Sequence, residues 1–283
     1  MDISIIINNY KTRGLLKQCL KGIVSNPPQH SFEIIVIDNN SGDGSVELVR
    51  EMFASSSSNF NPPPKKELPE AQADLEILTP NVKLISSRLN LGHHRGNNLG
   101  IKNSSGRYVL ILNTDIVAFD NVFDRLYDFL EANSKVALVG PKLKNPDGSI
   151  QASCMRFPKI LTPFYRRTFL NRFGVAEKEL NRYLMTDFNH DQIRSVDWIL
   201  GACEMIRRSA IDQVGMMDEN LFLYFGDVAW CKKFWRAGWA VYYFAEGDII
   251  HYHRRESAES GIFSRIFWIH AIDWVRYLLK YYK

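Results

Sequence analysis

A carboxylate that follows directly on a buried strand is well placed for chemistry, and this sequence offers one at Asp115. The apolar run Val109–Leu112 is typical of a strand covered on both faces, and Asn113-Thr114-Asp115 follows it without a spacer. Ligands of open α/β sheets bind just beyond the carboxyl ends of the strands. Asp115 is therefore a candidate ligand of a divalent cation; the alternative is a residue that only caps the turn before the next helix.

Asp227 and His251 are two further candidates for chemistry. Asp227 ends a dense aromatic segment and stands before a stretch whose apolar residues are spaced for one face of a helix. Such a carboxylate can cap the helix, a contribution of about 1 kcal/mol, and it can also act as a general base. His251 follows the apolar run Ala240–Phe244, and its imidazole can bind a divalent cation.

The elements that must position these groups follow from the apolar pattern. The expected strands are Ile3–Ile7, Glu33–Ile37, Val82–Ser86, Val109–Leu112, Val136–Val139 and Ala240–Phe244. Helix-period segments alternate with them, which predicts an α/β fold with a mostly parallel, nucleotide-binding sheet flanked by helices. The dinucleotide motif G-x-G-x-x-G is absent after the first strand. The turn Asn145–Gly148 predicts an antiparallel portion of the sheet.

Three segments depart from this alternation. Residues 54–70, with four consecutive serines and three consecutive prolines, are typical of a flexible surface insertion. Phe157–Ser195 has no clear period; it either shapes a site for a second substrate or is a plain surface excursion. The Gly-rich run Asn90–Gly100 can bring backbone N–H groups and Arg95 to a phosphate, or it is only a turn that opens a helix.

Composition limits the class of protein. The 283 residues carry a net charge of +4 without a concentrated basic stripe, so nucleic acid is not an expected partner, whereas an anionic ligand or a membrane surface fits. The four cysteines are far apart and form no C-x-x-C pair, which favours a reducing cytoplasm over a disulfide framework or a zinc site. Neither a signal peptide nor an apolar stretch of the ~18 residues that span a bilayer is expected.

The order of these motifs resembles the family-2 glycosyltransferases, inverting enzymes of the GT-A fold, and most of all their rhamnosyltransferase-like members. The similarity runs from Ile3 to about Ser257, outside residues 54–70 and most of 157–195. It implies a GT-A domain over residues 1–257, whose first half binds a nucleotide-sugar and whose second half binds the acceptor, followed by an amphipathic helix over 258–283. The implied reaction moves a sugar from a nucleoside-diphosphate sugar, such as dTDP-rhamnose or a UDP-sugar, to a hydroxyl of a glycan or lipid-linked acceptor in cell-surface polysaccharide synthesis.

The resemblance also implies a role for each matched residue. Asp227 corresponds to the catalytic base, Asp115 to a ligand of Mg²⁺ or Mn²⁺, and His251 to a late contact with the metal or the diphosphate. The implied nucleotide-sugar contacts are Asn8, Tyr10, Asp38, Asn40, Arg95, Asn98, Asn113 and Thr114, and the implied acceptor-side residues are Trp198, Gly201 and Ala202.

The sequence departs from the family pattern in three places. Asn113 replaces the first acid of the D-x-D metal motif, so only Asp115 should contact the metal directly. Gly226 precedes the base where Glu is usual, and His93-His94 stands where Phe-Ala is commoner.

Two other functions compete with this one. A sugar nucleotidyltransferase would share the sheet but should carry a Gly-rich, basic triphosphate loop after the first strand, of which Asn8–Gly14 is a poor version. A catalytically inactive nucleotide-sugar-binding protein would tolerate the departures at Asn113 and Gly226. The presence of both Asp115 and Asp227 argues against the inactive protein.

The tail, residues 262–283, is expected to form a helix with a narrow basic stripe on a broad apolar surface. The stripe comprises Arg265, Arg276, Lys280 and Lys283. Such a helix suits peripheral contact with an anionic membrane, on its cytoplasmic face, where Arg254 and Arg255 would add to the attraction. It equally suits packing on the catalytic domain or in a homodimer, and a lipid-linked acceptor tips the balance toward the membrane.

Overall fold

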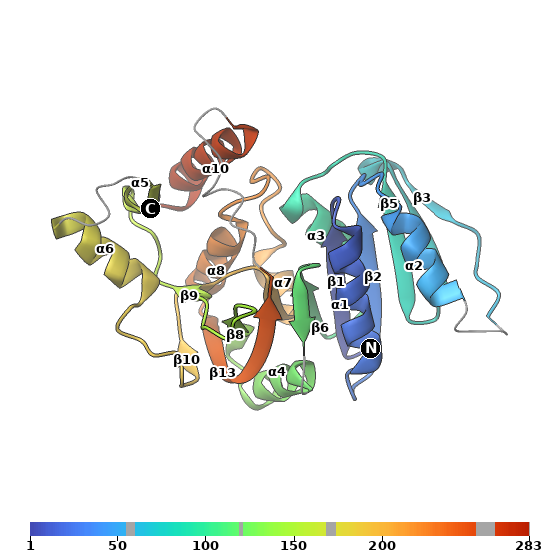
Figure 1. The fold of residues 1–283 in the computed structure, drawn as a ribbon, viewed down its shortest axis with the longest axis horizontal. Helices are drawn as coiled ribbons and strands as arrows, with labels where there is room; N and C mark the ends of the chain where they lie inside the picture. Colours follow the sequence, from blue (N-terminus) through green and yellow to red (C-terminus); the bar gives the residue numbers. More distant parts are fainter. Residues whose placement is uncertain (55–59, 119–120, 168–173, 253–263, 283) are drawn as a thin grey trace.

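Strands and helices alternate along most of this computed structural model, which describes all residues except 55–59, 119–120, 168–173, 253–263 and 283 (Figure 1). The strands are β1 Ile3–Asn9, β2 Phe32–Asp38, β3 Lys66–Leu68, β4 Ala73–Thr79, β5 Val82–Ser87, β6 Tyr108–Leu112, β7 Ile116–Ala118, β8 Val136–Lys144, β9 Cys154–Met155, β10 Arg194–Ser195, β11 Trp198–Ile199, β12 Cys203–Arg207 and β13 Ala240–His251. The helices are α1 Arg13–Ser25, α2 Ser45–Ala54, η1 Pro69–Ala71, α3 His93–Lys102, α4 Val122–Ala132, α5 Thr162–Arg167, α6 Gly174–Leu184, α7 Arg208–Val214, α8 Gly226–Arg236 and α10 Arg265–Tyr281.

The main sheet has the strand order β10-β13-β8-β12-β6-β1-β2-β5-β4-β3, with β7 paired to β13. Strands β6, β1, β2 and β5 are parallel, and β13 is parallel to β8. Strand β12 lies between β6 and β8 and is antiparallel to both. The expected mostly parallel sheet with flanking helices and an antiparallel portion is confirmed.

The origin of the antiparallel portion differs from the expectation. The turn Asn145–Gly148 closes only a single bridge, between Lys144 and Ile150. The chain then leaves the main sheet, and Cys154–Met155 pairs instead with β11. The antiparallel strand is therefore β12, which enters the sheet from a segment distant in the sequence.

Both faces of the parallel strands are buried, which explains their continuous apolar runs. Alternate side chains of β1 and β2 belong to two cores: Ile6, Ile35 and Ile37 lie on one face, and Ile5, Ile7 and Val36 on the other. Helices α1, α2 and α4 contribute to one core, and α3, α7, α8 and α10 contribute to the other. In Figure 1 helix α10 lies at the top of the molecule, outside α8.

All six expected strands are present, but two expectations about their surroundings were wrong. Within the predicted flexible insertion, residues 66–68 form edge strand β3, which is antiparallel to β4, and residues 69–71 form η1. Composition shows low apolar content, but it does not show that residues 66–68 pair with β4, the next strand along the chain. Residues 55–59 lie outside the described part. Strand β13 also continues past the predicted end to His251, so this histidine stands on a strand rather than in the loop after it.

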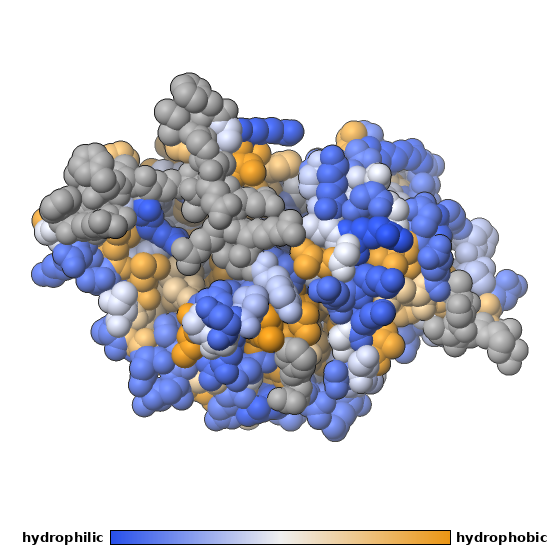
Figure 2. All heavy atoms as spheres, in the orientation of Figure 1, coloured by the Kyte–Doolittle hydropathy of each residue, from blue (hydrophilic) through white to orange (hydrophobic). Residues whose placement is uncertain are grey.

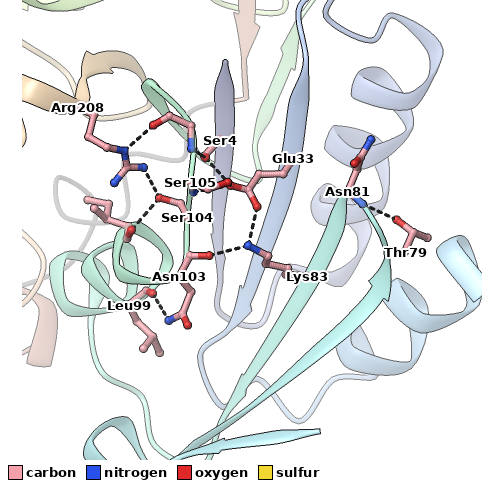
Figure 3. A network of polar contacts seen from close by, with 12 residues as sticks. Ser4, Glu33, Thr79, Asn81, Lys83, Leu99, Asn103, Ser104, Ser105 and Arg208 are labelled. Carbon is pink, nitrogen blue, oxygen red and sulfur yellow. Dashed lines mark hydrogen bonds and ion pairs between the residues drawn. The ribbon is translucent and has the colours of Figure 1, made fainter. Parts of the chain in front are cut away.

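A polar network fastens the amino ends of the parallel strands, opposite the end expected to carry the site (Figure 3). Buried Glu33 accepts hydrogen bonds from the Ser4 hydroxyl at 2.7 Å and the Ser105 backbone at 2.6 Å, and it pairs with Lys83 at 2.7 Å. Burial opposes ionisation of Glu33, but these donors outweigh it and hold its pKa below the usual value. The four central parallel strands are thus locked together at their amino ends.

Candidate active site

A chain of short polar side chains links the carboxyl ends of β1, β2 and β6. Asn9 donates from Nδ2 to Asp38 Oδ1 at 3.0 Å, and Thr12 donates from its hydroxyl to Asn9 Oδ1 at 2.8 Å. The Thr12 and Thr114 hydroxyls are 2.9 Å apart. Because Thr12 gives its only hydroxyl hydrogen to Asn9, Thr114 must be the donor in that contact. Asp38 also accepts the Ser41 N–H at 3.1 Å, so its carboxylate holds this loop in place.

Asp115 and His251, which lie far apart in the sequence, come together at this end of the sheet. Asp115 directly precedes β7, and His251 on β13 pairs with Ile116, so His251 Nε2 lies 3.4 Å from Asp115 Oδ2. His251 is only 2% exposed. The remaining carboxylate oxygen, Asp115 Oδ1, is buried and has no hydrogen-bond partner among the described residues.

Gln151 fixes the tautomer of His251. Its Nε2 donates to Asn145 Oδ1 at 2.7 Å and to the His251 carbonyl at 2.9 Å, so its Oε1 is the atom that faces His251 Nδ1 at 2.8 Å. His251 Nδ1 must therefore carry a hydrogen, and in the neutral imidazole the lone pair is on Nε2, facing Asp115.

These atoms fit a divalent cation. A buried carboxylate oxygen without a donor is costly unless a ligand compensates it, and oxygen is the ligand that Mg²⁺ and Mn²⁺ prefer. The described residues contain no group of three or more His, Cys, Asp or Glu side chains that could hold a metal by themselves. A cation bound through Asp115 and His251 would therefore need further ligands from a substrate diphosphate or water, as is common for Mg²⁺.

Asp227 stands in the first turn of α8, and its carboxylate is held at both oxygens. Oδ1 accepts the Val228 N–H at 2.8 Å, and Oδ2 accepts the Gly201 N–H at 3.2 Å. The N-cap position of α8 is Phe225, so capping does not account for Asp227. Burial raises the pKa of Asp227 despite the opposing effect of these hydrogen bonds, and a raised pKa makes a carboxylate a stronger base.

Gly201 and Ala202 connect Asp227 to Asn113, the first residue of the candidate metal motif. The Gly201 N–H bonds Asp227, and the Ala202 carbonyl accepts the Asn113 N–H at 2.9 Å. Gly201 also separates Asp227 from the buried Glu204: an ideal Cβ on Gly201 would lie 3.4 Å from Asp227 Cβ and 3.7 Å from Glu204 Oε2. Burial raises the pKa of Glu204 well above its usual value, which favours the neutral form that places no like charge against Asp227.

Two of the departures from the family pattern, Gly226 and His94, are halves of one packing arrangement. An ideal Cβ on Gly226 would lie 2.0 Å from His94 Nε2, so the imidazole fills the space that a side chain at 226 would need. His94 Nδ1 donates to the Leu221 carbonyl at 2.6 Å, and burial lowers the pKa of His94, which keeps the ring neutral. The missing Glu before the base is therefore explained by a histidine from α3.

We expect Gly226→Ala to lower the free energy of unfolding by about 1–3 kcal/mol, because the new methyl group overpacks against His94. In the double variant with His94→Ala, the combined loss should be smaller than the sum of the two single losses, because the smaller side chain relieves the overlap. Urea unfolding of all four proteins measures this coupling. Strictly additive losses would show that the two positions do not interact.

Three predicted site residues have other roles in this structure. Trp198 is 5% exposed, donates to the Arg156 carbonyl at 3.0 Å and belongs to a hydrophobic core, so its indole is used for packing rather than as an open surface. Asn98 is buried, and its amide hydrogens go to the Met217 carbonyl and to Glu219, which leaves none for a nucleotide. Arg95 Nε lies 3.8 Å from Glu219 Oε2, and Arg95 Nη2 donates to the Glu70 carbonyl at 3.4 Å.

The remaining predicted nucleotide contacts lie at the carboxyl ends of β1, β2 and β6. Asn8 donates from Nδ2 to the His93 carbonyl at 3.0 Å, and its Oδ1 is buried without a hydrogen-bond partner among the described residues. Tyr10 and Asn40 are exposed, and Asn113 and Thr114 follow β6. Thr12 and Gln151 were missed because neither belongs to a motif; only the three-dimensional contacts identify them.

The comparisons with known proteins agree with this geometry. Residues 4–215 match the family model described as Glycosyl transferase family 2. The N-acetylglucosaminyl-diphospho-decaprenol L-rhamnosyltransferase of Mycobacterium tuberculosis is 28% identical over 192 residues, 61% of this chain and 59% of that protein. The low-salt glycan biosynthesis hexosyltransferase Agl10 of Haloferax volcanii is 24% identical over 236 residues, 82% of this chain and 61% of that protein. The chain thus spans about three fifths of the length of these relatives.

Solved structures share the fold. The mannosyltransferase PcManGT from Pyrobaculum calidifontis, in complex with GDP-Man and Mn²⁺, matches with a TM-score of 0.57 and 15% identity over 99% of this chain and 70% of that one. GalNAc-T7 with UDP, GalNAc and Mn²⁺ matches with a TM-score of 0.62 and 14% identity over 90% of this chain and 44% of that one. At this identity the likeness shows the fold alone, and it confirms the GT-A architecture.

Proposed function

The chain belongs to glycosyl transferase family 2, and on that premise we propose that it is an inverting enzyme that moves a sugar from a nucleoside-diphosphate sugar to a hydroxyl of a glycan or lipid-linked acceptor. The observation that carries this proposal is the connection of a basic carboxylate, Asp227, to the metal motif through Gly201 and Ala202. Base and metal ligand thus stand at one end of the sheet on a single hydrogen-bonded frame.

Asp227 takes the proton of the acceptor hydroxyl as that oxygen attacks the sugar. Inversion needs only this one carboxylate, on the side of the sugar opposite the leaving group. Its two backbone donors hold the carboxylate in one orientation, and burial raises its pKa, so it accepts a proton more readily. Asp115 and His251 hold the cation, Mg²⁺ or Mn²⁺, which when bound would stabilise the negative charge on the leaving diphosphate.

Donor and acceptor are proposed from the relatives. The name of the mycobacterial relative specifies a rhamnosyl donor and a polyprenol-linked acceptor. The similarity to that protein covers 61% of the present chain. Transfer from dTDP-rhamnose or a UDP-sugar in cell-surface polysaccharide synthesis is therefore the reaction to test first. A sugar nucleotidyltransferase is disfavoured by the absence of a basic, Gly-rich loop after β1. An inactive binding protein would have no use for a carboxylate whose pKa is raised.

A screen of nucleotide-sugars tests the function. We expect one class of donor to raise the melting temperature more strongly with Mn²⁺ than without it, and to be hydrolysed slowly in the absence of acceptor. Because a ligand that binds only the folded state stabilises by RT ln(1 + [L]/Kd), a donor at about 100 times its Kd should add about 2.7 kcal/mol. Stabilisation without turnover, with acceptor glycans present, would favour the binding-only protein.

The outer face of α10 is the surface that we propose to rest on the membrane that carries a lipid-linked acceptor. Its exposed apolar residues recur every three or four positions, opposite the buried face of the helix: Trp268, Ile272, Val275 and Leu279. Figure 2 shows hydrophobic atoms at the top of the molecule beside hydrophilic ones, where Figure 1 places α10. Among the described residues, no helix is long and apolar enough to cross a bilayer.

A bilayer fits this stripe better than a second copy of the chain does. The stripe is roughly 17 Å long, at 1.5 Å per residue, and only one helix wide. The area that it offers is therefore far below the ~800 Å² per partner of a standard protein interface. Lipid needs no matching surface, and a Trp at the headgroup level is favourable. Two cations of the predicted basic stripe make contacts within the protein: Lys280 pairs with Asp218, and Arg276 donates to the Asn220 carbonyl. Lys283, Arg254 and Arg255 lie outside the described residues.

A further inference from the structure

The inner face of α10 holds the loop that leads into the base. Asp273 on this face is 1% exposed, and its carboxylate accepts three consecutive backbone N–H groups. Phe222 donates to Oδ1 at 3.1 Å, Leu223 donates to Oδ2 at 3.0 Å, and Tyr224 donates to Oδ2 at 3.0 Å. A buried carboxylate in a nest of backbone donors is a strong, charge-assisted anchor.

The same loop is bound on its other side by α3. The His93 N–H donates to the Phe222 carbonyl at 2.8 Å, and His94 donates to the Leu221 carbonyl. The approach is so close that an ideal Cβ on Gly92 would lie 2.7 Å from the Phe222 carbonyl oxygen. Residues 221–224 are thus fixed between α3, whose N-terminal end approaches the donor side of the sheet, and the C-terminal helix.

Phe225 completes the connection from this loop to Asp227. Its φ of +63° is in the left-handed region, which is unfavourable for a bulky residue and persists only where the surroundings hold it. Helix α10 provides those surroundings: the Phe225 ring lies 5.0 Å from the Trp274 ring, 5.7 Å from that of Tyr277 and 4.9 Å from that of His270. Only Gly226 separates this strained residue from the base.

We propose that Asp273 is a positioning residue for the base: by anchoring residues 222–224 it holds Phe225 in its strained conformation and so sets the place of Asp227. The C-terminal helix is then part of the active-site scaffold, although the family match ends at residue 215. This proposal rests on the proposed function for the role of Asp227. It does not depend on which sugar is transferred.

The test is Asp273→Asn in the full-length protein. The amide is isosteric, but it removes the negative charge and puts an NH₂ group in the place of one of the two acceptor oxygens, so the anchor is weakened without a change of shape. We expect kcat to fall about 10- to 100-fold with the KM for the donor within twofold, since small displacements of a reacting group cost this much. Amide hydrogen exchange should quicken at residues 222–224 and also at Gly201 and Val228, the donors to Asp227.

Two substitutions on α10 are matched controls. Tyr281→Phe removes the bond from the Tyr281 hydroxyl to Asp218, at 2.9 Å, and so weakens the docking of the helix without touching residues 222–224. Leu279→Ser alters only the outer face. Both should keep the wild-type kcat for a water-soluble acceptor at temperatures where they are folded. The Leu279 variant should also sediment less with anionic lipid vesicles, and unchanged sedimentation would contradict the membrane contact.

The outcomes separate this inference from the function it rests on. A folded Asp273→Asn protein with wild-type kcat, or one whose loss of rate only matches its loss of folded fraction, overturns the positioning role. A wild-type protein inactive with every donor refutes the proposed function instead. Hydrogen exchange still decides the inference in that case: unchanged exchange at Gly201 and Val228 in Asp273→Asn would mean that the anchor does not reach the base.

Discussion

Asp227→Asn is expected to lower kcat by about 10²-fold or more while donor affinity stays nearly unchanged. A base acts in the transition state, so its removal affects the rate far more than the binding of a nucleotide-sugar in the ground state. The measurement is kcat with acceptor present, together with the dissociation constant of the donor from its thermal stabilisation.

The pH dependence of kcat in the wild-type protein and in Asp227→Asn is a second test of the same role. Transfer requires ionised Asp227, and burial raises the pKa of this carboxyl, so the wild-type rate should fall as the pH falls through that raised pKa. The residual rate of the variant should lack this acidic limb. If the variant melts at a lower temperature but its folded fraction keeps full activity, Asp227 only stabilises the first turn of α8.

The parts of the fold that could be predicted are those governed by local sequence pattern. The central strands β1, β2 and β6 are rich in apolar residues because both of their faces are covered. Asp38 ends β2, and Asp115 follows β6 after Asn113-Thr114. The same reasoning failed for β4 and β12. Ala73–Thr79 carries acidic residues near the edge of the sheet, and Cys203–Arg207 has Glu204 within it, so neither reads as a buried strand.

The parts that could not be predicted depend on contacts between distant segments. In the sequence, Gly226 and His94 are two separate departures that cast doubt on the base; in the structure the imidazole occupies the space left by the glycine. In the sequence, Asp273 is one acid within a helix expected to carry a basic stripe, whereas in the structure its carboxylate accepts backbone N–H groups of the loop before Asp227. The resemblance places Trp198 on the acceptor side, but only the structure shows that its indole is buried in the core.

The metal site is tested by Asp115→Ala, which we expect to abolish the part of donor affinity that depends on Mn²⁺ and to leave the metal-free part nearly intact. The reason is that Asp115 Oδ1 is buried without a hydrogen-bond partner among the described residues, and Oδ2 faces His251 Nε2 at 3.4 Å. Both carboxylate oxygens of Asp115 would be stabilised by a bound cation, and without the cation they contribute little to nucleotide binding.

The melting temperature, recorded for each nucleotide-sugar with and without Mn²⁺, measures this difference. Asp248→Asn is the matched control, because it removes an acid from the same strand as His251 whose partners are Lys142 and Lys144. In Asp248→Asn, Mn²⁺ should increase the stabilisation by the nucleotide-sugar as much as it does in the wild-type protein. Gln151→Leu should reduce the effect without abolishing it, since it frees the orientation of His251 but leaves Asp115 in place. If the Mn²⁺ effect survives in Asp115→Ala and in His251→Ala as well, the cation binds elsewhere or the enzyme does not use one.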